Sequence, residues 1–336
     1  MKKGLFTLLY TFVAFPFLFS QGEMNNLALE ANPFLCKPGV TNKSPGKGLS
    51  IDYTYNPEFK MRPTNVESAS EVQANQRFSS KIKLPLINSQ RVKFLLGFKY
   101  AFERYHFEDI NPENYALFQR LNEAKLKDTE SAAYLIVPIN HKYYTSFRLS
   151  ASFRGDYGSF LTTRSDYATY RAAGMFGIKK SDDLEYGVGV YFAKNIQQTS
   201  IYPFGFLNWT FNDRWGLEAA IPVSIKMRRN LNENNLLLFG VDYSSQNYTL
   251  HVNDAIHIAQ QEKQLFHYRR ASMEISTSWM NKMKGWVWMQ YKVGYYVNLN
   301  SEARNLTDDL TYDLRPTGSI VGTVSFFLSP PKKYLK

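Results

Sequence analysis

A strict two-residue alternation between Arg91 and Glu103 constrains the fold of this chain more than any other feature. Apolar residues occupy every even position, namely Val92, Phe94, Leu96, Phe98, Tyr100 and Phe102. Charged residues hold most of the odd positions. Successive residues of a strand point to opposite faces, so this segment predicts a strand with one apolar and one charged face. It is about twice as long as the 5–6 residues typical of a soluble strand. That is the length a tilted strand needs to cross a bilayer.

The same alternation recurs along the chain. Further segments that carry it are residues 147–153, 184–192, 215–227 and 320–328. Aromatic residues reach 16% although the mean hydropathy is −0.37. No apolar segment after residue 19 approaches the length of a membrane helix. Together these features favour a transmembrane β-barrel, whose strands hide their hydrophobicity in alternation.

The N-terminus has the three regions of a secretory signal. Lys2 and Lys3 precede an apolar run over residues 5–19, and Ser20-Gln21-Gly22 follows it. The run is too short for a membrane anchor, so we predict a cleaved signal peptide over residues 1–22. The only cysteine, Cys36, lies beyond the run, which argues against lipoprotein processing and excludes an intramolecular disulfide. We therefore expect a periplasmic segment at 23–48, a barrel at 49–328 and a tail at 329–336.

The chain is strongly basic. Its net charge is +11, and without Lys2 and Lys3 the balance is 38 − 29, or +9. In a soluble protein this excess of positive charge would suggest a nucleic-acid partner, but the predicted export signal argues against such a partner. The expected partners are outer-membrane lipid, the barrel-assembly machinery and small anionic solutes. No cofactor motif is present, and the sequence does not determine the oligomeric state.

Short and long connections alternate between the expected strands. Short turns are expected at residues 87–90, 140–142, 181–183, 212–214 and 280–284, and longer loops at 60–72, 106–129, 155–165, 195–199 and 298–316. In outer-membrane barrels the short turns are periplasmic.

A first count gives thirteen strands, and the alternation of connections then fails between residues 235 and 263. A bacterial barrel favours an even number. A tight turn at Ser245-Gln246-Asn247, followed by a strand over residues 248–258, restores the alternation. We therefore predict an all-β, antiparallel, up-and-down transmembrane barrel of about fourteen strands, with twelve as the fallback, and both termini in the periplasm.

The five tryptophans flank two of the short turns. Trp209, Trp215 and Trp279 are expected to form half of an aromatic girdle at the periplasmic boundary, where indole rings prefer to lie. Trp286 and Trp288 share the parity of residues assigned to the lumen. Either a bulge exchanges the faces there, or these rings close the barrel floor.

The loop over residues 106–129 contains a helical pattern. Asn111-Pro112 can start a helix, and Leu117 and Leu121 are four residues apart. The helix would plug the lumen or lie over its mouth, but a surface loop with one helix is the simpler expectation.

Strand parity assigns more bases than acids to the lumen. The predicted basic lining is Arg77, Lys81, Lys83, Lys93, Lys99, Arg148, Arg154, Arg171, Lys179, Lys226, Arg270 and Lys292. The acids assigned there are Asp52, Glu103, Glu185, Glu218, Asp242 and Glu274. A basic lining would select anions in a channel or uptake pore. The competing interpretation is a narrow barrel filled by salt bridges, through which nothing passes.

Two other functions stay open. One is a non-conducting structural or surface-interaction barrel that uses its long loops. The other is an outer-membrane lipid hydrolase, which needs a serine activated by a histidine. The histidines His106, His141, His251, His257 and His267 have no recognisable spacing to such partners, so we expect no enzyme and no catalytic residue. The acidic run Glu302, Asp308, Asp309 and Asp313 lacks the spacing of a calcium loop, so no metal site is predicted.

Four segments carry a family resemblance: KIKLPLIN…RVKFLLGFKYAFERYHF, LEYGVGVYFAKN, YPFGFLNWTFNDRWGLEAAIPVSIKMRRN and GWVWMQYKVGYYVNLN. They resemble a family of Gram-negative outer-membrane β-barrel proteins of unknown function, over about residues 48–328. The resemblance implies a barrel in the outer membrane and supplies no catalytic or binding residues. The chain ends on Lys336 and not on the terminal aromatic residue that many such barrels use for assembly. Phe326 and Phe327 of the last strand are the candidates for that role.

Overall fold

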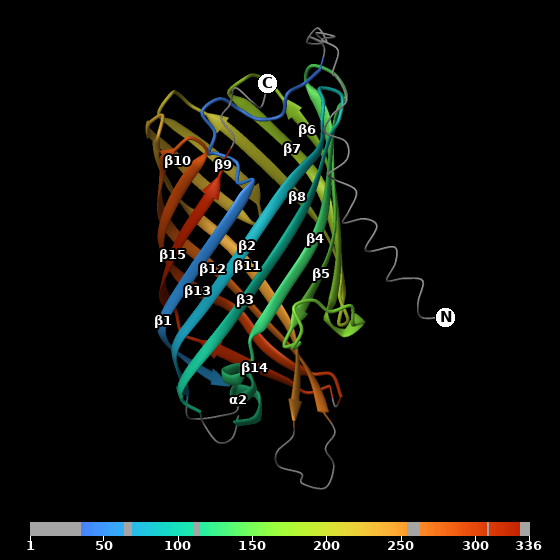
Figure 1. Ribbon diagram of the computed structural model, residues 1–336, viewed down its shortest axis with the longest axis vertical. Helices are drawn as coiled ribbons and strands as arrows, with labels where there is room; N and C mark the ends of the chain where they lie inside the picture. Colours follow the sequence, from blue (N-terminus) through green and yellow to red (C-terminus); the bar gives the residue numbers. More distant parts are fainter. Residues whose placement is uncertain (1–34, 64–68, 111–114, 254–262, 308, 330–336) are drawn as a thin grey trace, which may run out of the picture. The chain divides into compact units, whose positions relative to one another are not determined.

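The computed structural model describes residues 35–63, 69–110, 115–253, 263–307 and 309–329. The predicted signal peptide and nearly all of the tail lie outside these ranges. The described residues form one antiparallel sheet, closed into a barrel, and one α-helix (Figure 1). Among them, no helix is both long and apolar enough to cross a membrane.

The elements follow one another in an up-and-down order. They are β1 (Leu49–Pro63), β2 (Ser70–Asn88), β3 (Lys93–Asp109), α2 (Tyr115–Glu123), β4 (Leu126–Pro138), β5 (Tyr143–Gly155), the 3-10 turn η3 (Ser165–Tyr167), β6 (Ala168–Lys179), β7 (Leu184–Lys194), β8 (Thr199–Thr210), β9 (Trp215–Ile221), β10 (Ser224–Asn232), β11 (Asn235–Asn253), β12 (Lys263–Lys284), β13 (Val287–Asn305), β14 (Thr311–Pro316) and β15 (Ser319–Leu328).

The end of the chain closes the barrel. Strand β15 pairs with β13 on one side and with β1 on the other, and the short β14 pairs with the same two strands. β14 and β15 are therefore two parts of one barrel strand, interrupted at Thr317 and Gly318. Counted this way, the described residues form a 14-strand barrel, which confirms the predicted fold.

The predicted count is right although two of its steps are wrong. Residues 215–227 are not one strand but the hairpin β9–β10, in which Ala220 pairs with Ser224 around Pro222 and Val223. Paired residues point to the same face, and Ala220 and Ser224 are four positions apart, so the alternation passes through this turn without a break. Conversely, the predicted tight turn at 245–247 lies inside β11, where Gln246 pairs with Arg270 of β12. The end of the strand predicted at 248–258 lies outside the described residues.

The two ends of the barrel differ in their connections. One end, here the short-turn end, has the connections 89–92, 139–142, 180–183, 211–214, 233–234 and 285–286. The other, here the long-loop end, carries α2 and the 156–167 loop. That the short-turn end is periplasmic stays a prediction, from the usual pattern of outer-membrane barrels. The turn predicted at 280–284 is wrong, because β12 continues to Lys284 and the chain turns at Gly285, whose φ is 58°. Glycine adopts this left-handed backbone without strain.

The barrel wall has unequal height around its circumference. β9 and β10 have 7 and 9 residues, whereas β11 and β12 have 19 and 22. The long-loop half of β11 therefore extends past β10. It meets the end of β5, where Thr249 pairs with Gly155. A Cβ on Gly155 would lie 2.3 Å from the Thr249 carbonyl oxygen, so this close approach requires a glycine.

Candidate functional site: the barrel interior

Contacts between distant strands identify the inner face of the barrel. The Tyr105 hydroxyl of β3 lies 3.2 Å from the Tyr268 hydroxyl of β12, and the Tyr248 hydroxyl of β11 donates to Glu103 of β3 at 2.9 Å. These strands are not neighbours in the sheet. Side chains that share the parity of these residues therefore point into the interior, and the alternate residues form the apolar outer surface.

Most of the predicted basic lining is engaged in ion pairs. Nine of its twelve members form salt bridges with carboxylates of residues that the structure describes. They are Arg77, Lys99, Arg148, Arg154, Arg171, Lys179, Lys226, Arg270 and Lys292. Lys83 lies over the Tyr134 ring, 5.3 Å from its centroid. Lys81 and Lys93 form no salt bridge to a carboxylate within the described ranges. The positive excess inferred from parity is thus largely compensated.

Asp128 is the centre of the densest ion-pair cluster. Its side chain is 3% exposed and faces three cations: Arg154 at 3.2 Å, Arg77 at 3.8 Å and Lys99 in direct contact. These four residues come from β2, β3, β4 and β5. A buried carboxylate surrounded in this way neutralises charge that would otherwise be very costly to bury.

Two acids of β4 in this layer, Asp128 and Glu130, are absent from the acids predicted for the lumen. Asp128 and Glu130 were placed in or beside a loop predicted to end at residue 129, whereas β4 begins at Leu126. Glu130 accepts from Arg148 at 2.6 Å and pairs with Arg171 at 3.4 Å. The sequence does indicate that these acids belong to the strand. Asp128, Glu130 and Ala132 occupy alternate positions, and the residues between them continue the outer face of β4.

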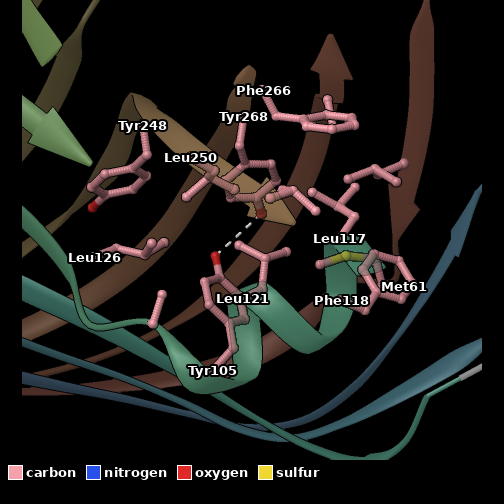
Figure 2. Close-up of a cluster of buried hydrophobic side chains, with 14 of the residues drawn as sticks. Met61, Tyr105, Leu117, Phe118, Leu121, Leu126, Tyr248, Leu250, Phe266 and Tyr268 are labelled. Carbon is pink, nitrogen blue, oxygen red and sulfur yellow. Dashed lines mark hydrogen bonds between the residues drawn. The ribbon is translucent and has the colours of Figure 1, made fainter. Parts of the chain in front are cut away.

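An apolar cluster fills the interior at the long-loop end. We call it the stopper; its buried members are Phe59, Met61, Val72, Tyr105, Leu117, Phe118, Leu121, Ala124, Leu126, Tyr248, Leu250, Val252, Phe266, Tyr268, Ala303 and Leu314. Figure 2 shows α2 presenting Leu117, Phe118 and Leu121 to side chains from strands on the opposite side of the barrel. Phe118 and Leu121 are completely buried. The expectation of a plain surface loop is therefore wrong, and the helix plugs the barrel.

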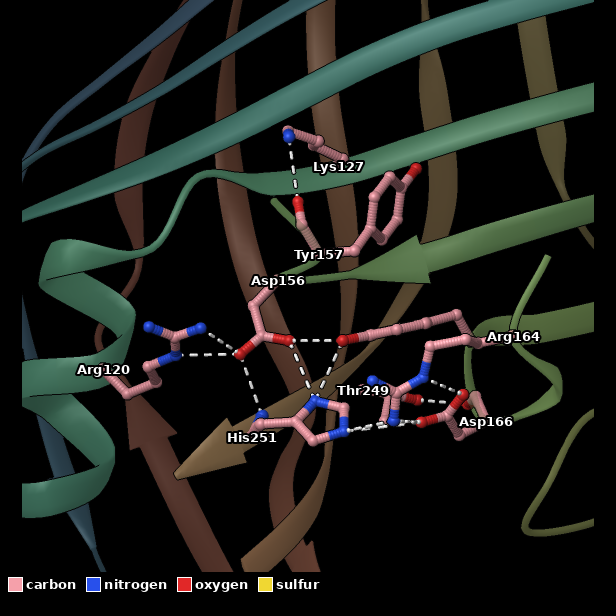
Figure 3. Close-up of polar contacts among 9 residues, drawn as sticks. Arg120, Lys127, Asp156, Tyr157, Arg164, Asp166, Thr249 and His251 are labelled. Atoms are coloured by element: carbon pink, nitrogen blue, oxygen red, sulfur yellow. Dashed lines mark hydrogen bonds and ion pairs between the residues drawn. The ribbon is translucent and has the colours of Figure 1, made fainter. Parts of the chain in front are cut away.

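Polar contacts at the rim fasten this helix to the barrel (Figure 3). Asp156 follows β5 and accepts from Arg120 of α2 at 2.6 and 2.8 Å, and from the backbone N–H of His251 at 2.9 Å. The Tyr167 hydroxyl donates to the other carboxylate oxygen at 3.0 Å. We call these residues, with Arg164 and Asp166, the rim latch.

The rim latch holds Asp156 ionised. Burial acts to raise its pKa, but hydrogen bonds from the side chain and backbone of His251 and from Arg120 outweigh it. The pKa of Asp156 falls from 3.8 to about 2 as a result. Asp156 is therefore a permanent anion at neutral pH and a fixed acceptor for α2.

Residues 35–48 cross the short-turn end of the barrel; we call them the strap (the dark blue coil opposite α2 in Figure 1). The Gly39 N–H donates to Glu185 at 2.8 Å, and the Ser44 N–H and hydroxyl donate to Glu218 at 2.9 and 2.8 Å. Lys47 donates to Gln290 at 2.9 Å. Two acids predicted for the lumen thus hold the strap instead of standing free.

Glu185 shows how local sequence prepares an anchor for the strap. It also accepts from the Tyr144 hydroxyl at 2.7 Å and from Asn208 at 3.0 Å. Tyr144 fits only because Gly177 stands opposite it, where a Cβ would lie 2.3 Å from the tyrosine ring. The carboxylate is consequently fixed before the strap reaches it.

Between the Asp128 cluster and the strap, the inner wall carries Lys81 and Lys83, which form no salt bridge within the described ranges, next to Arg148, which pairs with Glu130. We call these three residues the basic vestibule. Lys81 and Lys83 are exposed, and Lys81 stands directly opposite Lys99 on the neighbouring strand. Arg148 and Lys83 lie over the same Tyr134 ring, at 5.4 and 5.3 Å from its centroid. Like charges gathered this closely raise the local concentration of anions.

The tryptophans are divided between the two faces. Trp209 and Trp279, from the predicted girdle, are 45% and 43% exposed, and Trp215 is partly buried. Trp288 is buried and stacks on Phe327 at 6.2 Å in an interior cluster with Leu236, Leu238 and Met280. The sequence left two alternatives for Trp288, a bulge that exchanges the faces or a ring that closes the barrel floor. Its burial in this interior cluster favours the second.

Both ring nitrogens of His251 contact other members of the rim latch. The Nδ1 atom of His251 lies 3.2 Å from Asp156 and 2.9 Å from the Tyr167 hydroxyl. Its Nε2 atom lies 3.0 Å from Arg164 and 3.4 Å from Asp166. His257 lies outside the described residues. In the part of the chain that the structure covers, no group of three metal-ligating side chains occurs, and Glu302 and Asp309 pair with arginines.

Three solved barrels illustrate the fold likeness. The COG4313 outer membrane channel from Pseudomonas putida F1 has 9% identity and a TM-score of 0.46, and the match covers 87% of this chain and 98% of that one. A Pseudomonas aeruginosa FadL homologue has 9% identity and a TM-score of 0.42, with 84% and 90% covered. LpxR from Salmonella typhimurium has 7% identity and a TM-score of 0.30, with 83% and 100% covered. None of these values bears on the activity of this chain.

No curated protein matches the sequence. A family model does match, over residues 44–307, which is most of the barrel and includes the end of the strap. Its description assigns no activity, in agreement with the resemblance found from the strand patterns. The chain belongs to the family described as Domain of unknown function (DUF6268).

Proposed function

We propose that the protein is an outer-membrane channel for small anionic solutes, and that the barrel described above is its closed state. The observation that carries this proposal is the basic vestibule. Lys81 and Lys83 are exposed inside the barrel, and no described carboxylate forms a salt bridge with either of them. Exposed cations on an inner wall attract anions, whereas a purely structural interior would compensate them.

The closed state has two removable barriers along the axis. The strap covers the short-turn end, and α2 completes the stopper at the long-loop end, while the Asp128 cluster lies on the wall between them. The strap and α2 are separate from the wall, since each packs against strands to which it does not belong. Both can therefore leave while the fourteen-strand wall stays intact, and we propose that opening takes this route.

Planar-bilayer recording tests the proposal. Purified protein is compared with a variant that loosens both barriers, Glu218→Gln in the strap anchor together with Leu121→Ala in the stopper. We expect rare openings of the native protein, frequent openings of the variant, and chloride preferred over potassium in both. Adding Lys83→Glu to the variant should lower this preference, whereas Lys180→Glu, on a short turn outside the lumen, should not change it.

A non-conducting structural or surface-interaction barrel is the second candidate. It is favoured by the stopper, whose complete burial of Phe118 and Leu121 resembles a permanent core. The same recordings separate the two. If the loosened variant inserts and stays silent, the channel proposal fails and the structural role remains.

We further take the chain to act without catalysis. Both nitrogens of His251 already have partners, and no serine or cysteine is among them. Replacing His251 with alanine and following lipid turnover would test this, because a hydrolase that uses this histidine would lose its activity. Insertion by the barrel-assembly machinery, with Phe326 and Phe327 in the last strand, is part of the same proposal.

A further inference from the structure

A groove runs across the outer surface of the wall over β3 to β7. Its volume is about 510 Å³. The floor consists of small residues on the outward faces of adjacent strands: Ser131, Ala133, Ala151 and Ala172. Larger residues border it, among them Leu149 and Tyr170, which are 61% and 54% exposed. The outer surface is thus hollowed where four small side chains meet, between apolar walls.

The depth of the groove in the membrane follows from the strand register. Phe102 is nine residues beyond Lys93, the first residue of β3, which is roughly 30 Å along the strand. At a tilt of about 40° this corresponds to a height of roughly 23 Å, close to the apolar band of an outer-membrane barrel. Phe102 therefore marks the outer headgroup level. Phe98, which borders the groove, lies about 13 Å below it along the strand.

Basic and aromatic side chains gather at that headgroup level. The Lys125 ammonium lies 3.7 Å over the ring of Phe102. The register that pairs Phe102 with Lys127 and Glu103 with Leu126 puts Arg104 opposite Lys125, and Arg104 is exposed. Lys125 forms no salt bridge with any carboxylate in the described ranges. The nearest acid along the chain, Glu123, accepts from Gln119 on α2.

The 157–161 segment is fixed on the outer wall beside these bases. The Lys127 ammonium donates to the carbonyl oxygens of Tyr157, Gly158 and Ser159 at 2.8, 2.6 and 2.8 Å. Phe160 stacks on Tyr100 with the ring centroids 4.6 Å apart. Phe160 remains 64% exposed, so an anchored apolar side chain projects next to the basic pair and above the groove.

We propose that this surface binds one phosphorylated glycolipid of the outer leaflet. Its acyl chains would lie in the groove between Leu149 and Tyr170, and its phosphate would contact Lys125 and Arg104. Phe160 would pack against the upper part of the chains. The charges are complementary and the spacing between bases and groove suits a headgroup joined to its chains. The site lies on the outside of the wall, so it is independent of the proposed channel in the lumen.

Native mass spectrometry of the whole protein, released from a neutral detergent, tests the proposal. The probes are bis-phosphorylated lipid A, the same lipid without its phosphates, and phosphatidylcholine. We expect one lipid A per barrel, bound more tightly than either other probe. Ala151→Phe should fill the groove and abolish this binding, while Val293→Phe adds the same ring to the lipid-facing surface of β13 and should not. Lys125→Ala should weaken it about five-fold, while Lys284→Ala at the opposite rim should not.

Each outcome decides between specific and general lipid contact. Equal binding of all three probes, or unchanged lipid A binding by both Ala151→Phe and Lys125→Ala, would overturn the site. Heat-modifiable electrophoretic mobility establishes that every variant is a folded barrel. Conductance of the same preparations is measured separately, and neither presence nor absence of current affects the interpretation.

Discussion

Replacing Asp128 with asparagine tests whether the interior is held together by charge. The substitution keeps the shape of the side chain and removes its charge, leaving Arg77, Lys99 and Arg154 together without their common partner. At an effective dielectric constant of about 20, the lost attraction is about 5 kcal/mol for Arg154 at 3.2 Å and about 4 kcal/mol for Arg77 at 3.8 Å.

Part of that attraction offsets the desolvation of the buried ions, so the net effect is smaller than the sum. Removing one partner of a buried ion pair typically destabilises by about 3–5 kcal/mol, and we expect a loss in that range for Asp128→Asn. Asp242→Asn is the matched control. Asp242 also faces the lumen, but within the described ranges its one salt bridge is to Lys226 at 2.8 Å, and the two side chains are 22% and 33% exposed. Its replacement should cost about 1 kcal/mol or less.

Equilibrium unfolding in urea, followed by tryptophan fluorescence in lipid vesicles, measures both variants. The double variant Asp128→Asn, Lys99→Met should recover part of the stability, because it removes one of the stranded cations. If Asp128→Asn and Asp242→Asn lose the same small amount, the cluster is hydrated and the reasoning from its burial is wrong.

Three further predictions concern the segments that close the barrel. Leu121→Ala should destabilise the stopper by about 3 kcal/mol, because a fully buried leucine is lost. Amide exchange in α2 should become faster than in the native protein, while exchange in β13 stays unchanged. An α2 exchange rate equal to that of the native protein would count against the burial of Leu121. The rim latch should weaken in acid. The pKa of Asp156 is lowered to about 2, so its contribution of about 2 kcal/mol to stability is complete above pH 4 and is lost as the pH falls through 2. Release of α2 should follow this titration. In Asp156→Asn, α2 should already be loose at pH 7, so this pH dependence should be absent. Glu218→Gln should expose the strap to added protease, since Ser44 loses a charged acceptor; an unchanged cleavage rate would mean that the other anchors suffice.

The strand pattern could be read from the sequence because lipid enforces it. Outward residues between the headgroup levels must be largely apolar, so the two-residue alternation is visible where the wall crosses the membrane, as in Arg91–Glu103. The alternation carries no mark of a turn whose flanking paired residues are an even number of positions apart, such as Ala220 and Ser224, which explains why β9–β10 was taken for one strand. The same limit explains the false turn at Ser245–Asn247, where polar residues lie in a part of β11 beyond its pairing with β10.

The sequence predicts which side chains face the interior, but not which side chains they pair with there. Parity placed the bases on the inner side, but whether a base is compensated depends on strands that are far apart in sequence, as with Arg270 and Glu103. Asp128 was missed because the predicted loop ended at residue 129, four residues beyond its end in the structure. The burial of α2 was also beyond reach, since Leu117 and Leu121 give the same spacing on a surface helix and on a buried one.

The strap has a consequence for the order in which the protein matures. It touches connections along much of the chain, and its last residue, Gly48, donates to the carbonyl of Leu328 in the final strand. The strap can therefore complete its contacts only after the last strand has been built into the wall. Its docking then marks the moment at which a newly made barrel becomes sealed.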